Sequence, residues 1–118
     1  MGTRETIQDY FDKLKQKKGW DALLGDGMIF TSFASPTKEL RGKEAYLQST
    51  KRFFSMVISM EVRELIVEGA KTCALTRYQL RLPGSTTGFH SDVAEIFTVA
   101  NGKIDSFGIY CDTSPYPK

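Results

Sequence analysis

The sequence predicts one α+β domain in which helices cover one face of a curved antiparallel sheet. Two long amphipathic helical segments and a short strand come first, and four strand-like segments with a two-residue period follow them. The chain has 118 residues, close to the commonest size of a single domain, so we treat residues 1–118 as one unit. Elements in this order form α+β folds, because successive strands pair as hairpins and leave the helices on one side.

The first predicted helix runs from Thr3 and ends at Gly19. Its apolar residues recur at intervals of three and four, which is typical of a helix with one buried face. They are Ile7, Tyr10, Phe11 and Leu14. Residues 20–24 predict a short second helix, which Gly25 and Gly27 should stop within two turns.

A strand and a long helix are predicted next. Residues 28–33 are rich in Ile, Phe and Thr and indicate a strand, and Ser35 with Pro36 predicts a short polar loop after it. The third helix begins after Gly42, where apolar residues again share one helical face. These are Tyr46, Leu47, Thr50, Phe53, Phe54 and Val57.

The second half of the chain predicts a meander of four long strands. Asn101 and Gly102 separate the last two segments, and this dipeptide is a strong signal for a tight hairpin. The tail from Thr113 contains two prolines and cannot extend the sheet far. The four predicted strands cover residues 58–68, 71–82, 89–100 and 103–112.

Composition excludes several classes of function. Sixteen basic and fourteen acidic residues leave a formal charge of +2, which is far from the basic footprint of a nucleic-acid-binding protein. The chain offers neither a signal peptide nor a membrane span, so we expect a cytoplasmic protein. Cys73 and Cys111 are too few for a disulfide scaffold, and we expect both to be reduced.

Strand alternation places one carboxylate on the inner face of the sheet. In residues 71–82 the more apolar set includes Thr76 and Tyr78, and in residues 89–100 the matching set includes Val93, Glu95 and Phe97. An apolar environment disfavours the charged form of a carboxyl group, so such a group can donate or accept a proton near neutral pH. Glu95 is therefore the acid/base candidate, with Tyr78 as its hydrogen-bond partner.

Several phrases of the sequence resemble the nuclear transport factor 2-like superfamily and, within it, the SnoaL-like proteins. The resemblance covers almost the whole chain and rests on the order and spacing of the phrases. They are Gly-Trp-Asp-Ala-Leu-Leu at 19–24, Asp-Gly-Met-Ile-Phe-Thr-Ser at 26–32, Leu-Arg-Gly-Lys-Glu-Ala at 40–45, Asp-Val-Ala-Glu-Ile-Phe-Thr-Val at 92–99 and Asn-Gly-Lys-Ile at 101–104.

The resemblance implies a cone-shaped α+β barrel of the cystatin type, in which a strongly bent sheet wraps the helices around an apolar pocket. Aromatic walls with one or two polar groups suit a small, flat, hydrophobic ligand. We expect no cofactor and no metal, and a homodimer formed through the outer face of the sheet. The expected lining residues are Tyr10, Phe11, Trp20, Phe30, Phe33, Phe54, Val93, Phe97 and Tyr110.

Known members of the superfamily include ketosteroid isomerase, polyketide cyclases, epoxide hydrolases, scytalone dehydratase and proteins without catalysis. Glu95 resembles the protonated acid in the oxyanion hole of ketosteroid isomerase. The tyrosine of that site falls on Phe11, although Tyr10 is adjacent, and its general base falls near Ser32. The isomerase mechanism is therefore not expected here, and fold alone does not choose among the remaining activities.

Other catalytic arrangements find little support in the residues. The epoxide hydrolases need an Asp-Arg-Asp set inside the cavity, but alternation places Arg77 and Arg81 on the opposite face. A dehydratase of the scytalone type would need pocket histidines, and His90 shares the outer face with Asp92. One histidine with scattered acids also provides no metal-ligand set.

Two functions stay open at this point. In the first, the chain binds a small hydrophobic molecule and acts as an isomerase, lyase or hydrolase through Glu95. In the second, it is a non-catalytic dimerisation or accessory module whose cone is filled by its own aromatic side chains. Glu95 would then be a buried carboxylate that bonds to Tyr78, Tyr110 or Trp20 without reacting.

Overall fold

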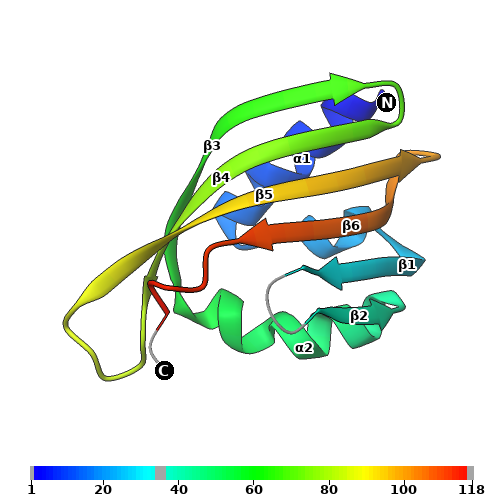
Figure 1. The fold of residues 1–118 in the computed structure, drawn as a ribbon. Helices are drawn as coiled ribbons and strands as arrows, with labels where there is room; N and C mark the ends of the chain where they lie inside the picture. Colours follow the sequence, from blue (N-terminus) through cyan, green and yellow to red (C-terminus); the bar gives the residue numbers. More distant parts are fainter. Residues whose placement is uncertain (1, 34–36, 117–118) are drawn as a thin grey trace.

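The computed structural model describes residues 2–33 and 37–116, in which two helices lie against one strongly bent sheet (Figure 1). The sheet is strongly bent, and the short strand at one of its edges lies beside the second helix. The elements in chain order are α1 (Thr3–Gln16), a short 3₁₀ helix η1 (Trp20–Leu23), β1 (Leu24–Ser32), β2 (Lys38–Arg41), α2 (Lys43–Met56), β3 (Val57–Glu68), β4 (Lys71–Arg81), β5 (Gly88–Ala100) and β6 (Lys103–Cys111).

The sheet has the order β2-β1-β6-β5-β4-β3. The predicted meander is confirmed, because β3, β4, β5 and β6 pair as consecutive antiparallel neighbours. At the β5–β6 turn, Asn101 and Gly102 both have positive φ angles, of 53° and 72°, as the twist of a tight hairpin requires. The strand β1 joins the sheet in parallel with β6, so its connection to the meander passes through β2 and α2.

The N-terminal half differs from the prediction at two places. Gly25 and Gly27 do not end a helix but lie inside β1, where the pairing with β6 shifts register between Leu24 and Ile29. A Cβ atom on Gly25 would lie 3.2 Å from the carbonyl oxygen of Ile104, so this strand approaches its neighbour closely at a glycine. The strand β2 was not predicted, because a run of four residues with three charges gives little strand signal.

The predicted loop at Ser35 and Pro36 lies outside the described residues. The other predicted elements agree with the structure to within a few residues at their ends. No helix in the described part of the chain is both long enough and apolar enough to cross a membrane.

The two helices cover different parts of the concave face. The helix α1 packs against β3 and β4, and α2 packs against β1 and β2. The core under α1 is aromatic: the ring of Phe97 lies 5.6 Å from that of Tyr10, 5.7 Å from that of Phe11 and 4.4 Å from that of Phe107, between ring centroids. This edge-on and tilted packing fills the narrow end of the cone.

Replacing Phe97 by Ala should lower the free energy of unfolding by about 3–5 kcal/mol, because the ring is fully buried and three aromatic neighbours would lose contact with it. Urea unfolding at equilibrium measures this loss. Ile58 is 47% exposed on β3, and its replacement by Ala should cost about 1 kcal/mol or less. Equal losses in the two variants would contradict this description of the core.

Candidate functional site

A cavity of about 220 Å³ remains between α2 and the concave face of the sheet. Its buried floor consists of Phe30, Tyr46, Tyr78, Val93, Glu95 and Phe107. Half-buried side chains form its walls, namely Leu40, Thr50, Phe53, Phe54, Ile109, Cys111 and Tyr116. Lys38 and Ser49 are exposed and form its rim together with Ser32, which is half-buried.

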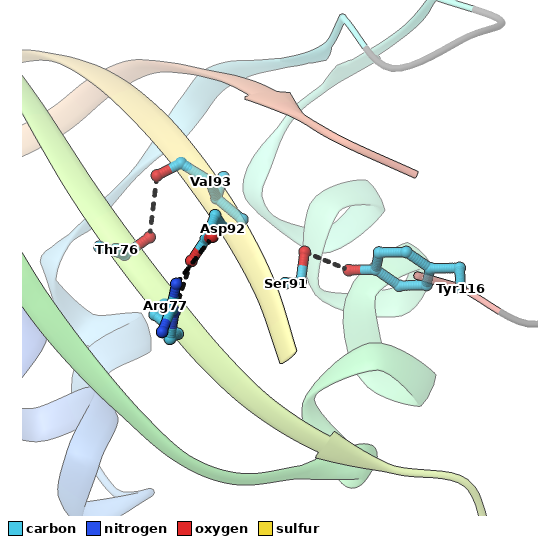
Figure 2. A network of polar contacts seen from close by, with 6 residues as sticks. All are labelled: Thr76, Arg77, Ser91, Asp92, Val93 and Tyr116. Atoms are coloured by element: carbon cyan, nitrogen blue, oxygen red, sulfur yellow. Dashed lines mark hydrogen bonds and ion pairs between the residues drawn. The ribbon is translucent and has the colours of Figure 1, made fainter. Parts of the chain in front are cut away.

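The pairing of β4 with β5 places the two site candidates on the same face. Burial alternates along both strands, so Tyr78 and Glu95 point inward while Arg77 and Asp92 point outward. Arg77 and Asp92 form a bidentate ion pair on the outer face (Figure 2). The Nε atom of Arg77 lies 2.7 Å from Oδ1 of Asp92, and its Nη2 atom lies 3.1 Å from Oδ2. The arginine is therefore engaged on the outer face and does not reach the cavity.

The carboxyl group of Glu95 is bound by two hydroxyl groups of β4. The hydroxyl of Thr76 lies 2.6 Å from Oε2, and the hydroxyl of Tyr78 lies 3.0 Å from the same oxygen. Only 2% of Glu95 is exposed. Because both bonds end on Oε2, Oε1 is the oxygen that is left to contact a ligand in the cavity.

Thr76 can serve both protonation states of Glu95. Its hydroxyl oxygen also lies 3.3 Å from the main-chain oxygen of Val93 (Figure 2). A hydroxyl group has one proton to donate and two lone pairs that accept. When Glu95 is ionised, Thr76 donates to Oε2. When Glu95 is protonated at Oε2, the Thr76 oxygen accepts a hydrogen bond from this O–H, and the Thr76 hydroxyl donates to the main-chain oxygen of Val93.

Burial raises the pKa of Glu95 to about 7, although the hydrogen bonds from Thr76 and Tyr78 act in the opposite direction. Near neutral pH the group is therefore present in both protonation states. Burial and then the charge of Glu95 raise the pKa of Tyr78 and of Tyr46. These phenols stay protonated and are available as hydrogen-bond donors beside the carboxyl group.

Five of the predicted site residues line the cavity: Phe30, Phe54, Tyr78, Val93 and Glu95. Three others belong to the packed core instead. Tyr10, Phe11 and Phe97 interlock through their ring edges and leave no free volume between them. The cavity lies under α2 and not under α1, which corrects the prediction for these three residues.

The predictions for Phe33, Tyr110 and Trp20 are also corrected. Phe33 and Tyr110 lie outside the cone, where their rings stack with centroids 4.4 Å apart and planes within 5°. Phe33 lies three residues after Phe30, and Tyr110 lies three residues after Phe107. Because side chains alternate along a strand, residues an odd number of positions apart point to opposite faces of the sheet. Trp20 packs against Phe54, at 4.9 Å between ring centroids, and so supports the wall from behind.

The structure adds site residues that the sequence reasoning did not single out. Thr76 was assigned to the inner face but not as a partner of Glu95, although it lies two residues from Tyr78 on the same face. Tyr46 was assigned to the apolar face of its helix and not to the cavity. Tyr116 follows the last strand, and neither periodicity nor a motif marks it as a cavity residue.

Tyr116 shows how the C-terminal tail contributes to the cavity. After β6 the chain turns toward the end of α2 that leads into β3 (Figure 1). The hydroxyl of Tyr116 donates to Ser91 Oγ at 3.0 Å (Figure 2), and its ring lies 5.4 Å from that of Phe89. These contacts hold the tail across one side of the cavity.

No group of three or more His, Cys, Asp and Glu side chains within residues 2–33 and 37–116 is placed to bind a metal ion. His90 is exposed on β5, away from the cavity floor. Among the described residues, the cavity contains one carboxyl group, several hydroxyl groups, one thiol and the ammonium group at the rim.

A direct match to a family model shows the family of the chain. The family model of the SnoaL-like domain matches residues 7–107. The chain belongs to the SnoaL-like family. Among curated proteins, none matches this sequence significantly.

Solved structures of SnoaL-like and related proteins share the fold at low sequence identity. A candidate SnoaL-like polyketide cyclase from Jannaschia sp. CCS1 superposes with a TM-score of 0.80 at 18% identity, covering 98% of this chain and 93% of its own. A protein with a ketosteroid isomerase-like fold from Catenulispora acidiphila, solved with trimethylamine, gives a TM-score of 0.77 at 16% identity and covers 96% and 89%. An LEH-like epoxide hydrolase from M. tuberculosis gives a TM-score of 0.76 at 18% identity and covers 94% of this chain and 83% of its own.

The raised pKa of Glu95 makes the stability of the fold depend on pH. The unfolded carboxyl titrates near 4.5 and the folded one near 7, so the folded state holds the extra proton between these values. The free energy of unfolding should therefore fall by about 3 kcal/mol as pH rises through this window. The Glu95→Gln variant, whose side chain does not titrate, should lack this decrease.

Urea unfolding of both proteins at about pH 5 and about pH 8 measures the difference. Other groups titrate equally in the two proteins, so the quantity to compare is wild type minus variant. A difference that stays constant between the two pH values would contradict the assignment.

Proposed function

We propose that the chain binds a compact hydrophobic molecule in the cavity under α2 and that Glu95 transfers a proton to or from it. The observation that supports this most strongly is the carboxyl group at the cavity floor, buried and yet within reach of a ligand through Oε1. A group with a pKa of about 7 is an effective acid and an effective base near neutral pH.

The size of the cavity limits the ligand. Its volume of about 220 Å³ is below the roughly 300–1,000 Å³ of sites for drug-sized molecules. A ring system of one or two rings or a short terpenoid matches this volume, whereas a tetracyclic skeleton exceeds it. The same volume counts against the accessory-module alternative, in which the aromatic side chains fill the cone completely.

The hydroxyl groups around Glu95 support a role in proton transfer. Thr76 has a partner in each protonation state, Glu95 Oε2 or the Val93 oxygen, so neither state leaves it without a hydrogen bond. Tyr78 donates to the carboxylate and thereby favours its ionised form. Tyr46 lies at the same floor with its proton retained and can donate to an oxygen of the ligand.

This arrangement favours isomerase or lyase chemistry over hydrolysis. Both reactions start when a base removes a proton from a carbon next to a carbonyl group. An isomerase then returns this proton at another carbon, whereas in a lyase the bond to a leaving group breaks and the proton is given to the departing group. One carboxyl group that exchanges its proton near neutral pH is sufficient for that sequence. Hydrolysis would require a second group to position water, and the described residues of the floor include one acid and no basic side chain.

Proton abstraction can be measured without knowing the natural substrate. Wild-type protein in D₂O should accelerate the exchange of the α-hydrogens of menthone and carvone, two compact cyclic ketones, as followed by proton NMR. The Glu95→Gln variant should lose about a hundredfold of this acceleration, because the amide cannot accept the proton. The Tyr78→Phe variant should keep part of it, since Thr76 still binds Glu95.

Glu68→Gln is the matched control, because Glu68 is exposed at the end of β3 and does not line the cavity. It should exchange at the wild-type rate. Exchange no faster than in buffer, or an unchanged rate in the Glu95→Gln variant, would count against a role of Glu95 in proton transfer.

We also propose that the outer face of the sheet pairs with the same face of a second copy. Two neighbouring rows of residues cross this face, joined by the strand register: Ile66, Cys73, Ile96 and Gly108 in one, and Leu75, Ala94 and Tyr110 in the other. Arg63, Glu64, Arg77 and Asp92 lie beside them and offer both signs of charge to a two-fold related copy. An apolar centre with a charged border is typical of such interfaces.

Sedimentation velocity should give the mass of a dimer for the wild type. The Ile96→Lys variant should give a monomer, because two lysines near the two-fold axis would be desolvated and would repel each other. Ile58→Lys introduces the same charge at a comparably exposed position outside the two rows and should stay dimeric. A monomeric wild type, or dissociation of both variants alike, would contradict this interface.

A further inference from the structure

We infer that the ligand of the cavity is a compact apolar carboxylic acid, bound with its carboxylate against Lys38 at the rim and its apolar body toward Glu95. The inference rests on the proposed function, since it names the ligand class of the same cavity. It derives from the distribution of charge and hydroxyl groups between rim and floor.

The described residues of the cavity carry charge at two positions. Lys38 is exposed at the rim, and Glu95 is buried at the floor. Side chains such as Leu40, Phe53 and Ile109 separate the two and contribute no hydrogen-bonding group. A molecule that occupies the cavity therefore contacts a cation at one end, an apolar middle and a proton-exchanging acid at the other end.

The edge strand β2 aims Lys38 at the cavity and turns its charged neighbours away. Lys38 and Leu40 alternate onto the cavity side, whereas Glu39 and Arg41 lie on the other side and pair with each other at 3.3 Å. The acidic side chain nearest to Lys38 in sequence is thus engaged with Arg41. No ion pair joins the ammonium group of Lys38 to an acidic side chain within residues 2–33 and 37–116, so an anionic ligand can bind it.

Two hydroxyl groups accompany Lys38 at the rim. Ser32 on β1 is the register partner of Lys38 across the β1–β2 pairing, so their side chains share one face. Ser49 reaches the same rim from α2, one turn after Tyr46. An ammonium group and two hydroxyl donors match the acceptor oxygens of a carboxylate, which takes several hydrogen bonds.

The opposite orientation of such a ligand would be unfavourable. A carboxylate at the floor would lose its hydration among aromatic rings and would lie beside Glu95, which carries the same charge when ionised. The apolar body of the ligand is more stable at the floor, where it contacts the rings of Phe30, Tyr46 and Phe107. Rim and floor together fix the direction in which the molecule enters.

Acid and alcohol pairs with the same carbon skeleton test this inference. Cinnamate with cinnamyl alcohol, perillate with perillyl alcohol, and geranate with geraniol are compact enough for the cavity. Titration calorimetry at neutral pH should show that the wild type binds the acid of at least one pair about fivefold more tightly than its alcohol, as expected for one solvent-exposed charge pair. The Lys38→Met variant should bind both members of that pair equally.

Lys18→Met is the matched control, because it removes the same charge from an exposed lysine that does not line the cavity. It should keep the wild-type preference for the acid. Equal binding of acid and alcohol by the wild type, or a preference that survives Lys38→Met, would overturn the inference and leave the proposed cavity function intact. If none of the six compounds binds, the proposed function fails together with it.

Discussion

One carboxyl group is buried on the concave face, and the structure of the rest of the site depends on how this group is stabilised. An isolated carboxylate in an apolar interior is costly unless it is protonated or hydrogen-bonded. Glu95 meets both conditions, because two hydroxyl groups of the neighbouring strand bind a single oxygen and burial holds its pKa near 7. The antiparallel register of β4 and β5 is what brings these groups together.

The remaining elements determine the volume of the cavity next to this carboxyl group. The aromatic residues of α1 and β5 fill the narrow end of the cone, so the free volume is displaced to the region under α2. The short edge strand then contributes Lys38 to the rim, and the C-terminal tail contributes Tyr116 to the wall. A similar sheet with a different filling would provide a different cavity, which agrees with the variety of activities on this fold.

Much of this arrangement could be predicted from the sequence, because strand alternation and helical spacing are local properties. The inner faces of β4 and β5, and with them Glu95 and Tyr78, followed from alternation alone. Phe33 and Tyr110 were placed on the wrong side although the same rule excludes them, since each lies an odd number of residues from an inner aromatic residue. Consistent use of the strand period would have corrected both.

Other features depend on tertiary packing and leave no local signal. Whether Tyr10 and Phe11 border free space or fill it depends on how their rings meet Phe97, a residue far away in the sequence. The tail residue Tyr116 reaches the cavity through one hydrogen bond to Ser91 and one ring contact. The strand β2 forms because β1 offers it an edge, and its own composition gives little indication of a strand.

The proposed proton transfer depends most directly on the ionisation of Glu95 in the folded protein. Carbon-13 NMR of the glutamate side-chain carboxyl groups, assigned by comparison with the Glu95→Gln variant, follows this titration residue by residue. We expect one carboxyl resonance whose titration midpoint lies near pH 7, and we expect this resonance to be absent from the spectrum of the variant. A Glu95 resonance that titrates near the ordinary value of 4.5 would show that the group is solvated, and would contradict both the buried site and the proton transfer assigned to it.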